Sequence, residues 1–320
     1  MHDGNARSPL APVFLAGPTA VGKSAVALAL AERLGGEIIS VDSMQVYRGL
    51  DLGTAKPSAE ERARVPHHLI DVVELSESFD AAKFLRLAEA AVKDIQSRGR
   101  VPIFCGGTGL YFKAWFDGLG AAPPADPRVR AELEATPLAD LLAELERRDP
   151  ATFARIDRQN PRRVIRALEV IRLTGQPFSA QRAAWPSTLD ARPSNCLIAF
   201  TREPADLRAR IEARVDAMFA AGLVEETRAL LPRGLADNPA ALQALGYRQV
   251  VEHLRGARGL GDTIALVKTK TWQFARRQRT WFRWQLAVEW VPLIPQSEPA
   301  AVARELADRI AARSPVAPLD

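Results

Sequence analysis

The sequence predicts an α/β fold in which a parallel sheet core is interrupted by a helical insertion. Short apolar runs that suit buried parallel strands alternate with segments of helical spacing. The strand-like runs are 13–16, 37–41 and 101–105, and the helical segments are 23–34 and 81–97. Because alternating strands and helices form a parallel sheet covered on both faces, the first third of the chain predicts such a sheet.

The pattern changes near residue 118, where glycine and proline become frequent. The spacing is helical from 127 to 174, and an apolar strand returns only at 196–200. We therefore predict a helical insertion over residues 120–193, within a core made of residues 1–119 and 194–320. Residues 1–9 are predicted to be a loose tail. The rest of the core is predicted to be helical at 204–221, 223–231, 239–254 and 260–284, with a strand at 288–291 and an amphipathic helix after Pro299.

The composition is that of an ordinary globular protein. The 320 residues are 47% apolar and 25% charged, with a formal net charge of +5. This charge favours an anionic partner without choosing between nucleic acid, a membrane surface and small phosphates. Two cysteines, Cys105 and Cys196, cannot make a disulfide framework, which favours a cytoplasmic setting. No apolar stretch approaches the roughly 18 residues of a membrane span, so we expect no membrane partner, and we expect a monomer.

A phosphate-binding loop follows the first strand. It fits the pattern G-x-x-x-x-G-K-[ST] and consists of Gly17, Pro18, Thr19, Ala20, Val21, Gly22, Lys23 and Ser24. Its glycines let successive N–H groups point at one anion, and the positive end of the following helix adds to the attraction. Lys23 is predicted to reach the terminal phosphates, and the Ser24 hydroxyl to bind Mg²⁺. A strand before the loop and a helix after it predict a core like that of P-loop NTPases.

The acid that a kinase needs is in a different place. P-loop kinases and NTPases organise Mg²⁺ with an acid after a later strand. Here the strand at 101–105 leads into Gly106, Gly107 and Thr108, and the acid, Asp42, follows the strand at 37–41. In a parallel sheet that position faces the ligand crevice, which predicts Asp42 at its mouth. The alternative is that Asp42 and Ser43 only cap the next helix, and spacing alone does not choose between the two.

Further short motifs follow in order along the chain. Between about residues 13 and 291 the motifs are Gly17 to Ser24, Asp42-Ser-Met-Gln45, Tyr47, Gly53-Thr-Ala-Lys-Pro57, Gly106-Gly-Thr-Gly-Leu-Tyr111, Asn160-Pro-Arg-Arg163, Arg166-Ala-Leu-Glu169, Arg210-Ile-Glu-Ala-Arg214 and Gly246-Tyr-Arg248. In this order they resemble the motifs of bacterial tRNA dimethylallyltransferases, also called tRNA isopentenyltransferases. The resemblance implies transfer of a dimethylallyl group from dimethylallyl diphosphate to the exocyclic N6 amine of the adenosine 3′-adjacent to the anticodon. The P-loop would then hold a diphosphate leaving group, and no kinase-type acid is needed. Two departures are Ser24, where Thr is commoner, and Gln243-Ala-Leu, where some members carry a basic residue.

The resemblance also implies the roles of individual residues. Asp42 would orient the amine and remove its proton, and Arg214 would join Lys23 and Mg²⁺ in stabilising the departing diphosphate. Thr108 would hydrogen-bond in the same crevice; the alternative is a turn residue that only caps a helix over 110–115. Contacts to the tRNA anticodon stem-loop are implied at Asp42, Ser43, Met44, Gln45, Thr108, Arg130, Arg162, Arg163, Val164, Ile165, Arg166, Gln243, Ala244, Leu245, Gly246, Tyr247 and Arg248.

Two basic segments could carry the RNA. In the insertion, Arg162, Arg166 and Glu169 fall on one helical face. The helix predicted at 260–284 carries six Lys and Arg residues from 268 to 283 with no acid between them, interleaved with five aromatic residues. We predict that this basic face follows phosphates, while helical spacing favours core packing for most of its aromatic residues. His67 and His68 are predicted to lie in a loop with a structural role.

Three other functions are weighed against this prediction. A P-loop kinase of a small metabolite would leave both basic segments without a role. A prenyltransferase that uses free adenine nucleotides would need no extended cationic surface. In an RNA-binding module without catalysis, Lys23 and Asp42 would be dispensable. Transfer of a prenyl group to RNA accounts for all of these features together.

Overall fold

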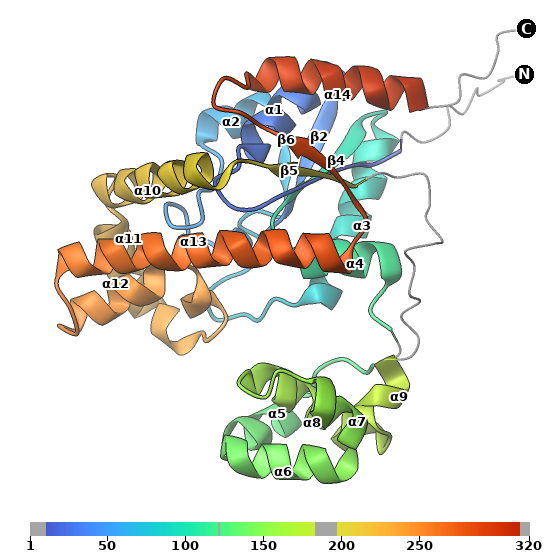
Figure 1. The fold of residues 1–320 in the computed structure, drawn as a ribbon, viewed down its shortest axis with the longest axis vertical. Helices are drawn as coiled ribbons and strands as arrows, with labels where there is room; N and C mark the ends of the chain where they lie inside the picture. Colours follow the sequence, from blue (N-terminus) through green and yellow to red (C-terminus); the bar gives the residue numbers. More distant parts are fainter. Residues whose placement is uncertain (1–10, 121, 183–196, 314–320) are drawn as a thin grey trace, which may run out of the picture. The chain divides into compact units, whose positions relative to one another are not determined.

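The computed structural model describes residues 11–120, 122–182 and 197–313, so the predicted tail at 1–9 and Cys196 lie outside the described residues. The core is a parallel sheet of six strands in the order β3-β2-β4-β1-β5-β6 (Figure 1). The strands are β1 (Val13–Ala16), β2 (Gly36–Val41), β3 (His67–His68), β4 (Val101–Gly106), β5 (Leu197–Thr201) and β6 (Val288–Pro292). The predicted parallel α/β sheet is therefore confirmed.

Helices cover this sheet and continue beyond it. The helix after the P-loop, α1 (Lys23–Leu34), packs beside α14 (Pro299–Arg313) at the end of the described chain. A long helix, α13 (Leu260–Gln285), packs against α10 (Pro204–Ala220) and α12 (Tyr247–Leu254) (Figure 1). Leu15, Leu30, Ile103 and Phe200 belong to the same buried apolar cluster, which joins the central strands to α1. The other helices outside the predicted insertion are α2 (Ala59–Arg64), α3 (Ala81–Ser97), α4 (Gly109–Asp117) and α11 (Leu223–Leu230).

Two predictions about local structure are wrong. The single helix predicted at 239–254 is a short 3₁₀ turn (Ala241–Gln243) followed by α12, because Gly246 adopts a φ of 96° that ends one element before the next begins. His67 and His68 lie in the edge strand β3 instead of a loop. The His68 Nε2 lies 2.7 Å from Oε2 of the buried Glu37. The structural role predicted for these histidines agrees with that contact.

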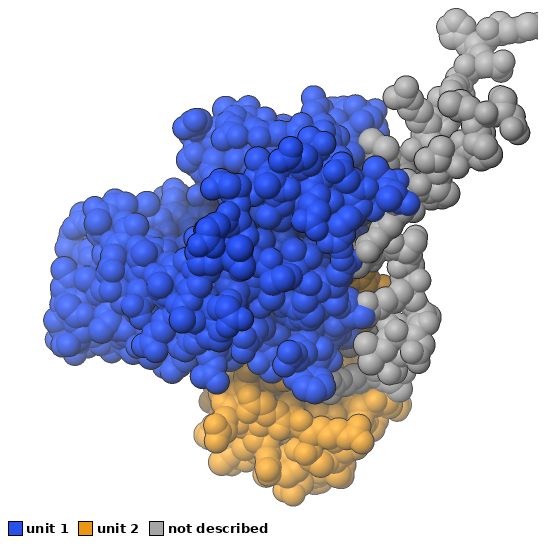
Figure 2. Space-filling view, turned by 45° about the horizontal axis from the view of Figure 1, so that its top comes forward, with its two compact units in different colours: residues 1–113, 193–320 blue, residues 114–192 orange. Residues whose placement is uncertain are grey.

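The chain divides into two compact units, residues 1–113 with 193–320 and residues 114–192 (Figure 2). The sequence-based insertion begins six residues later, at 120. The described residues of the smaller unit form helices, and its core includes Leu133, Leu145, Val164 and Leu168. Its helices are α5 (Pro127–Glu134), α6 (Leu138–Arg148), α7 (Pro150–Arg155), α8 (Pro161–Thr174) and α9 (Phe178–Arg182), and α4 spans the border between the units. Within the described ranges, no helix is long and apolar enough to cross a membrane.

Candidate active site

Three neighbouring strands end at the same edge of the sheet and deliver the predicted site. Gly106 at the end of β4 pairs with Ala16 of β1 on one side and Val41 of β2 on the other. The P-loop follows β1, Asp42 follows β2, and Thr108 comes two residues after β4. A cavity of about 300 Å³ lies here, and Lys23, Asp42 and Arg214 are among the residues that line it. The tertiary structure therefore joins the predicted phosphate loop and the predicted base in one cavity.

Arginines hold the P-loop from outside. Arg202 donates from Nε to the carbonyl oxygen of Val21 at 2.7 Å, and Arg210 donates from Nε to that of Ala20 at 2.9 Å. Ala20 has a φ of 64°, which is unusual for a residue with a Cβ. These contacts direct carbonyl oxygens toward guanidinium groups, which leaves the amide groups of the loop to face an anion. Sequence reasoning assigned no role to Arg202 or Arg210. Arg210 opens the motif that ends at Arg214, but nothing in the local pattern places either side chain against the loop.

Positive charge gathers where the phosphates would sit. Burial lowers the pKa of Lys23, neighbouring Cys105 and Asp42 raise it, and Arg214 lowers it. Burial likewise lowers the pKa of Arg214, and nearby Arg210 lowers it further. Arg214 belongs to α10, and its guanidinium lies 3.4 Å from the hydroxyl of Thr19 in the P-loop. Lys23 and Arg214 are both partly buried, and cations that repel one another are stabilised when an anion binds between them.

Asp42 uses one oxygen to shape its own turn. Its Oδ1 accepts hydrogen bonds from the backbone N–H of Met44 at 2.8 Å and of Gln45 at 3.3 Å. Its Oδ2 accepts no hydrogen bond from the described residues. Both functions weighed for Asp42 are therefore sterically compatible, since one oxygen caps the turn and the other remains for a ligand. The predicted contact residues Ser43, Met44 and Gln45 form this turn.

Thr108 fixes that turn from the neighbouring strand. Its hydroxyl accepts a hydrogen bond from the Ser43 N–H at 3.1 Å, while its own N–H donates to the Val41 carbonyl. The backbone carbonyl of Thr108, and not its side chain, receives the Tyr111 N–H at the start of α4. The Thr108 side chain therefore does more than cap a helix, because it joins the end of β4 to the Asp42 turn.

A glutamine that sequence reasoning missed bridges two of these loops. Gln278 on α13 accepts the Thr19 N–H of the P-loop at 2.9 Å and donates to the Gly107 carbonyl at 2.9 Å. A Cβ at Gly107 would lie 2.3 Å from Gln278 Nε2, so the glycine permits this close approach. The bridge spans 259 positions between Gln278 and Thr19, which explains why no local pattern reveals it.

The aromatic residues of α13 divide between core and surface. Phe282 is fully buried, Trp272 packs against the main core, and the Trp281 ring occupies the space where a Cβ at Gly109 would lie. Trp284 is 75% exposed, beside a shallow hollow that includes arginines of the same helix. The prediction of core packing is confirmed for Phe282 and Trp272, whereas Trp281 is half-buried and lines the same hollow as Trp284, and Phe274 is exposed.

Two of the four arginines predicted to contact tRNA in the smaller unit share one buried carboxylate. Glu169, which is fully buried, binds Arg130 at 2.8 Å and Arg166 at 2.7 Å. Arg162 and Arg163 are exposed on α8. The side chains of Val164 and Ile165, also predicted contacts, pack in the core of the unit. Contact with tRNA stays a prediction here. Because Val164 and Ile165 are buried, the arginines are the residues of this set whose side chains could reach an RNA.

A similar division holds for the segment 243–248. Gln243 and Arg248 are exposed, whereas Ala244 and Tyr247 are buried. The Tyr247 hydroxyl donates to Glu226 Oε1 at 2.5 Å and accepts the Gly53 N–H at 3.1 Å. Tyr247 thus ties α12 to the loop that follows Asp42. A direct contact from Leu245 or Gly246 to tRNA also stays a prediction.

Fold and site together define a P-loop α/β protein whose phosphate loop faces a carboxylate across a cationic cavity. A family model described as "IPP transferase" matches residues 45–285. The chain therefore belongs to the IPP transferase family.

Similar proteins carry the family's names. A tRNA dimethylallyltransferase of Anaeromyxobacter dehalogenans (strain 2CP-C) is 48% identical over 93% of this chain and 99% of its own length. One from Halorhodospira halophila is 51% identical, covering 86% of this chain and 91% of its own. The solved tRNA isopentenylpyrophosphate transferase of Bacillus halodurans matches 96% of this chain and 98% of its own, with 40% identity and a TM-score of 0.68. A eukaryotic dimethylallyltransferase acting on tRNA is 26% identical, with a TM-score of 0.78, over 97% of this chain and 81% of its own.

Proposed function

We propose that this protein transfers a dimethylallyl group from dimethylallyl diphosphate to the N6 amine of the adenosine 3′-adjacent to the anticodon of tRNA, and releases diphosphate. The observation that carries the proposal is the single cavity that Lys23, Asp42 and Arg214 line together. Family membership supports the reaction class, and the cavity supplies groups for both halves of the reaction.

The P-loop half of the cavity would stabilise the leaving group. As the bond between the allylic carbon and the diphosphate oxygen breaks, negative charge grows on that oxygen. Lys23, Arg214 and the loop N–H groups stabilise it there, and this stabilisation is strongest where water is excluded. Arg202 and Arg210 hold the loop carbonyls away from that charge.

Magnesium fits this half of the cavity as a partner of the substrate. No cluster of three or more acidic, histidine or cysteine side chains within the described ranges could hold a metal by itself. The exposed Ser24 hydroxyl at the start of α1 would be one oxygen ligand, and Mg²⁺ commonly takes its remaining ligands from water and phosphate oxygens. When bound there, Mg²⁺ would neutralise charge on the diphosphate.

The Asp42 half of the cavity would activate the nucleophile. The adenine amine is a weak nucleophile because its lone pair is delocalised into the ring. As N6 bonds to the allylic carbon it becomes more acidic, and Asp42 takes one of its two protons. The Thr108 hydroxyl holds the turn that carries Asp42 through the Ser43 N–H at 3.1 Å.

The RNA partner follows from the charge outside the cavity. The basic face of α13 and the exposed arginines of α8 would follow phosphates, and a base in the anticodon loop is easily extruded into a pocket. We take the active form to be a cytoplasmic monomer. The kinase alternative gains nothing from the cavity, because neither carboxylate that lines it follows β4: Asp42 follows β2, and Glu61 lies on α2.

The decisive experiment incubates the protein with dimethylallyl diphosphate, Mg²⁺ and unmodified tRNA, and analyses the digested nucleosides by mass spectrometry. The proposal expects one adenosine per substrate tRNA to gain a dimethylallyl group, with release of diphosphate. Parallel reactions with free AMP and with ATP plus small metabolites test the alternatives. Prenylation of AMP in place of tRNA, or phosphoryl transfer from ATP, would replace the proposed function.

A further inference from the structure

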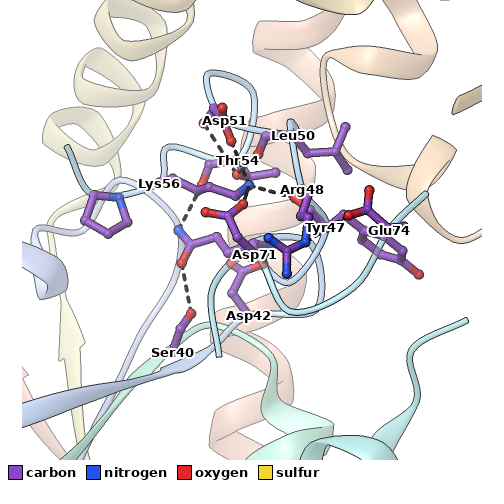
Figure 3. Close-up of polar contacts among 12 residues, drawn as sticks. Ser40, Asp42, Tyr47, Arg48, Leu50, Asp51, Thr54, Lys56, Asp71 and Glu74 are labelled. Carbon is purple, nitrogen blue, oxygen red and sulfur yellow. Dashed lines mark hydrogen bonds and ion pairs between the residues drawn. The ribbon is translucent and has the colours of Figure 1, made fainter. Parts of the chain in front are cut away.

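The segment Gly53-Thr-Ala-Lys-Pro57 contains a lysine for which the proposed reaction has no role. Lys56 lies at the wall of the cavity that also contains Lys23, so an anion-binding role is the first expectation. Its side chain, however, is only 3% exposed. Its ammonium already has three acceptors, the carbonyl of Tyr47 at 2.6 Å and the carboxylates of Asp51 at 2.7 Å and Asp71 at 2.5 Å (Figure 3). Since an ammonium has three donors, Lys56 has none left for a diphosphate.

These three contacts draw together segments that are separate in the chain. Asp71 receives a second cation, Arg62, at 2.8 Å, and its own N–H donates to the Gln45 carbonyl at 3.1 Å. Burial alone would raise the pKa of Asp71, but hydrogen bonds from Lys56 and Arg62 hold it below its ordinary value. The backbone of Asp71 has a φ of 57°, a strained conformation that its surroundings must maintain. Lys56 therefore stabilises the segment on which Gln45 rests.

Gln45 connects the loop of residues 51–57 to Asp42, the predicted base. Its side-chain amide donates to the carbonyls of Thr54 at 3.1 Å and Ala55 at 3.2 Å, and its Oε1 accepts from Ser40 at 2.8 Å. Its backbone N–H donates to Oδ1 of Asp42. The loop of residues 51–57 thus touches the Asp42 turn through Gln45, and Lys56 holds that loop in place.

We propose that Lys56 is a positioning residue, which holds the loop of residues 51–57 against Gln45 so that Asp42 keeps its place in the cavity. This inference rests on the proposed function, because it assigns Lys56 to the nucleophile half of that reaction. It predicts that loss of Lys56 impairs the chemical step and leaves the binding of dimethylallyl diphosphate intact.

The first test is Lys56→Met, which keeps the length of the side chain and removes the ammonium. We expect kcat for tRNA prenylation to fall about 10- to 100-fold, the usual effect of misplacing a reacting group by about 1 Å. The KM for dimethylallyl diphosphate should change by less than about threefold, because Lys56 does not contact it. A raised KM with an unchanged kcat would overturn the inference in favour of anion binding. An unchanged kcat and KM would show that Lys56 does not position the turn.

A second variant, Asp71→Asn, tests the inference even if Lys56→Met does not fold. It distinguishes the two roles because each predicts a different change in kcat and in the KM for dimethylallyl diphosphate. Asn keeps the size of the side chain but removes the charge that holds Lys56 and Arg62. If Lys56 positions the turn, kcat falls and the KM for dimethylallyl diphosphate stays. If Lys56 is an anion-binding residue that Asp71 restrains, the KM falls and the inference is wrong.

Lys83→Met is the matched control. It also removes one cation that pairs with a carboxylate, here Glu77 at 2.8 Å, but on α3 and outside the lining of the cavity. Its kcat should equal that of the parent, and an equal loss in both lysine variants would overturn the inference. The activity of the parent protein distinguishes the failure of the two proposals. If the parent prenylates tRNA and the Lys56→Met variant is equally active, only the positioning role of Lys56 is refuted. A parent without transferase activity refutes both.

Discussion

The Asp42 carboxylate offers the sharpest prediction, because its two oxygens have separable functions. Oδ1 accepts the N–H groups of Met44 and Gln45, and Oδ2 accepts no hydrogen bond from the described residues. Asp42→Asn keeps an acceptor for the turn but cannot take a proton at neutral pH. Asp42→Ala removes both. The two variants therefore separate a structural role from a catalytic one.

The expected magnitudes differ enough to decide. A lost turn acceptor costs about 1 kcal/mol of stability, which lowers the melting temperature by about 2–4 °C in a unit of this size. A lost general base lowers the rate about 100- to 10,000-fold, or about 3–5 kcal/mol in the barrier. We therefore expect both variants to lose turnover by factors in that range, while only Asp42→Ala also loses stability.

The assay measures single-turnover prenyl transfer and thermal melting on the same preparations. Binding of tRNA and dimethylallyl diphosphate should change much less than the rate, because the loss lies in the transition state. An Asp42→Asn variant that melts like the parent and transfers the prenyl group at a near-parental rate would refute the role of Asp42 as base. Asp42 would then be a turn residue only.

Four further predictions concern the rest of the molecule. Lys23→Ala should lower the rate about 100- to 1,000-fold with little change in tRNA affinity, and near-normal turnover would remove the P-loop from the mechanism. Arg162→Ala with Arg166→Ala should flatten the dependence of tRNA affinity on salt by about one log–log unit per lost phosphate contact, measured by filter binding; an unchanged slope would assign these arginines to structure alone. Gln278→Met should lower kcat about 10- to 100-fold in steady-state assays, and unaltered kinetics would reduce its bridge to packing. For Glu37, burial raises the carboxyl pKa, but Arg98 and His68 hold it below its ordinary value of 4.5, so its stabilisation is present above that value and is lost as pH falls through the folded-state pKa. Thermal melts at decreasing pH should therefore show that Glu37→Gln loses less stability in this acid range than the parent protein does. The same dependence of melting temperature on pH in both proteins would contradict this.

Local patterns predict the sheet well because the apolar run of a buried strand and the apolar spacing of a helix can each be recognised within a few residues. The strands at 13–16 and 101–105 and the helix at 23–34 agree with the structure to within one residue. The errors lie where tertiary context overrides local spacing. The two-residue strand β3 exists only because Ile38 and Ile39 of β2 offer it an edge to pair with. The helix predicted at 239–254 breaks at Gly246, whose positive φ no periodicity reveals.

The site divides in the same way. The sequence by itself determined the phosphate loop, the acid after the second strand and the basic helices, because each depends on residue types at short, fixed spacings. Only the tertiary structure decided which other side chains support these features. Gln278 binds Thr19, Arg202 and Arg210 bind the carbonyls of Val21 and Ala20, and Lys56 binds the carbonyl of Tyr47. The physical reason is that a hydrogen bond across many positions depends on how whole elements pack, and local propensities carry no record of that packing.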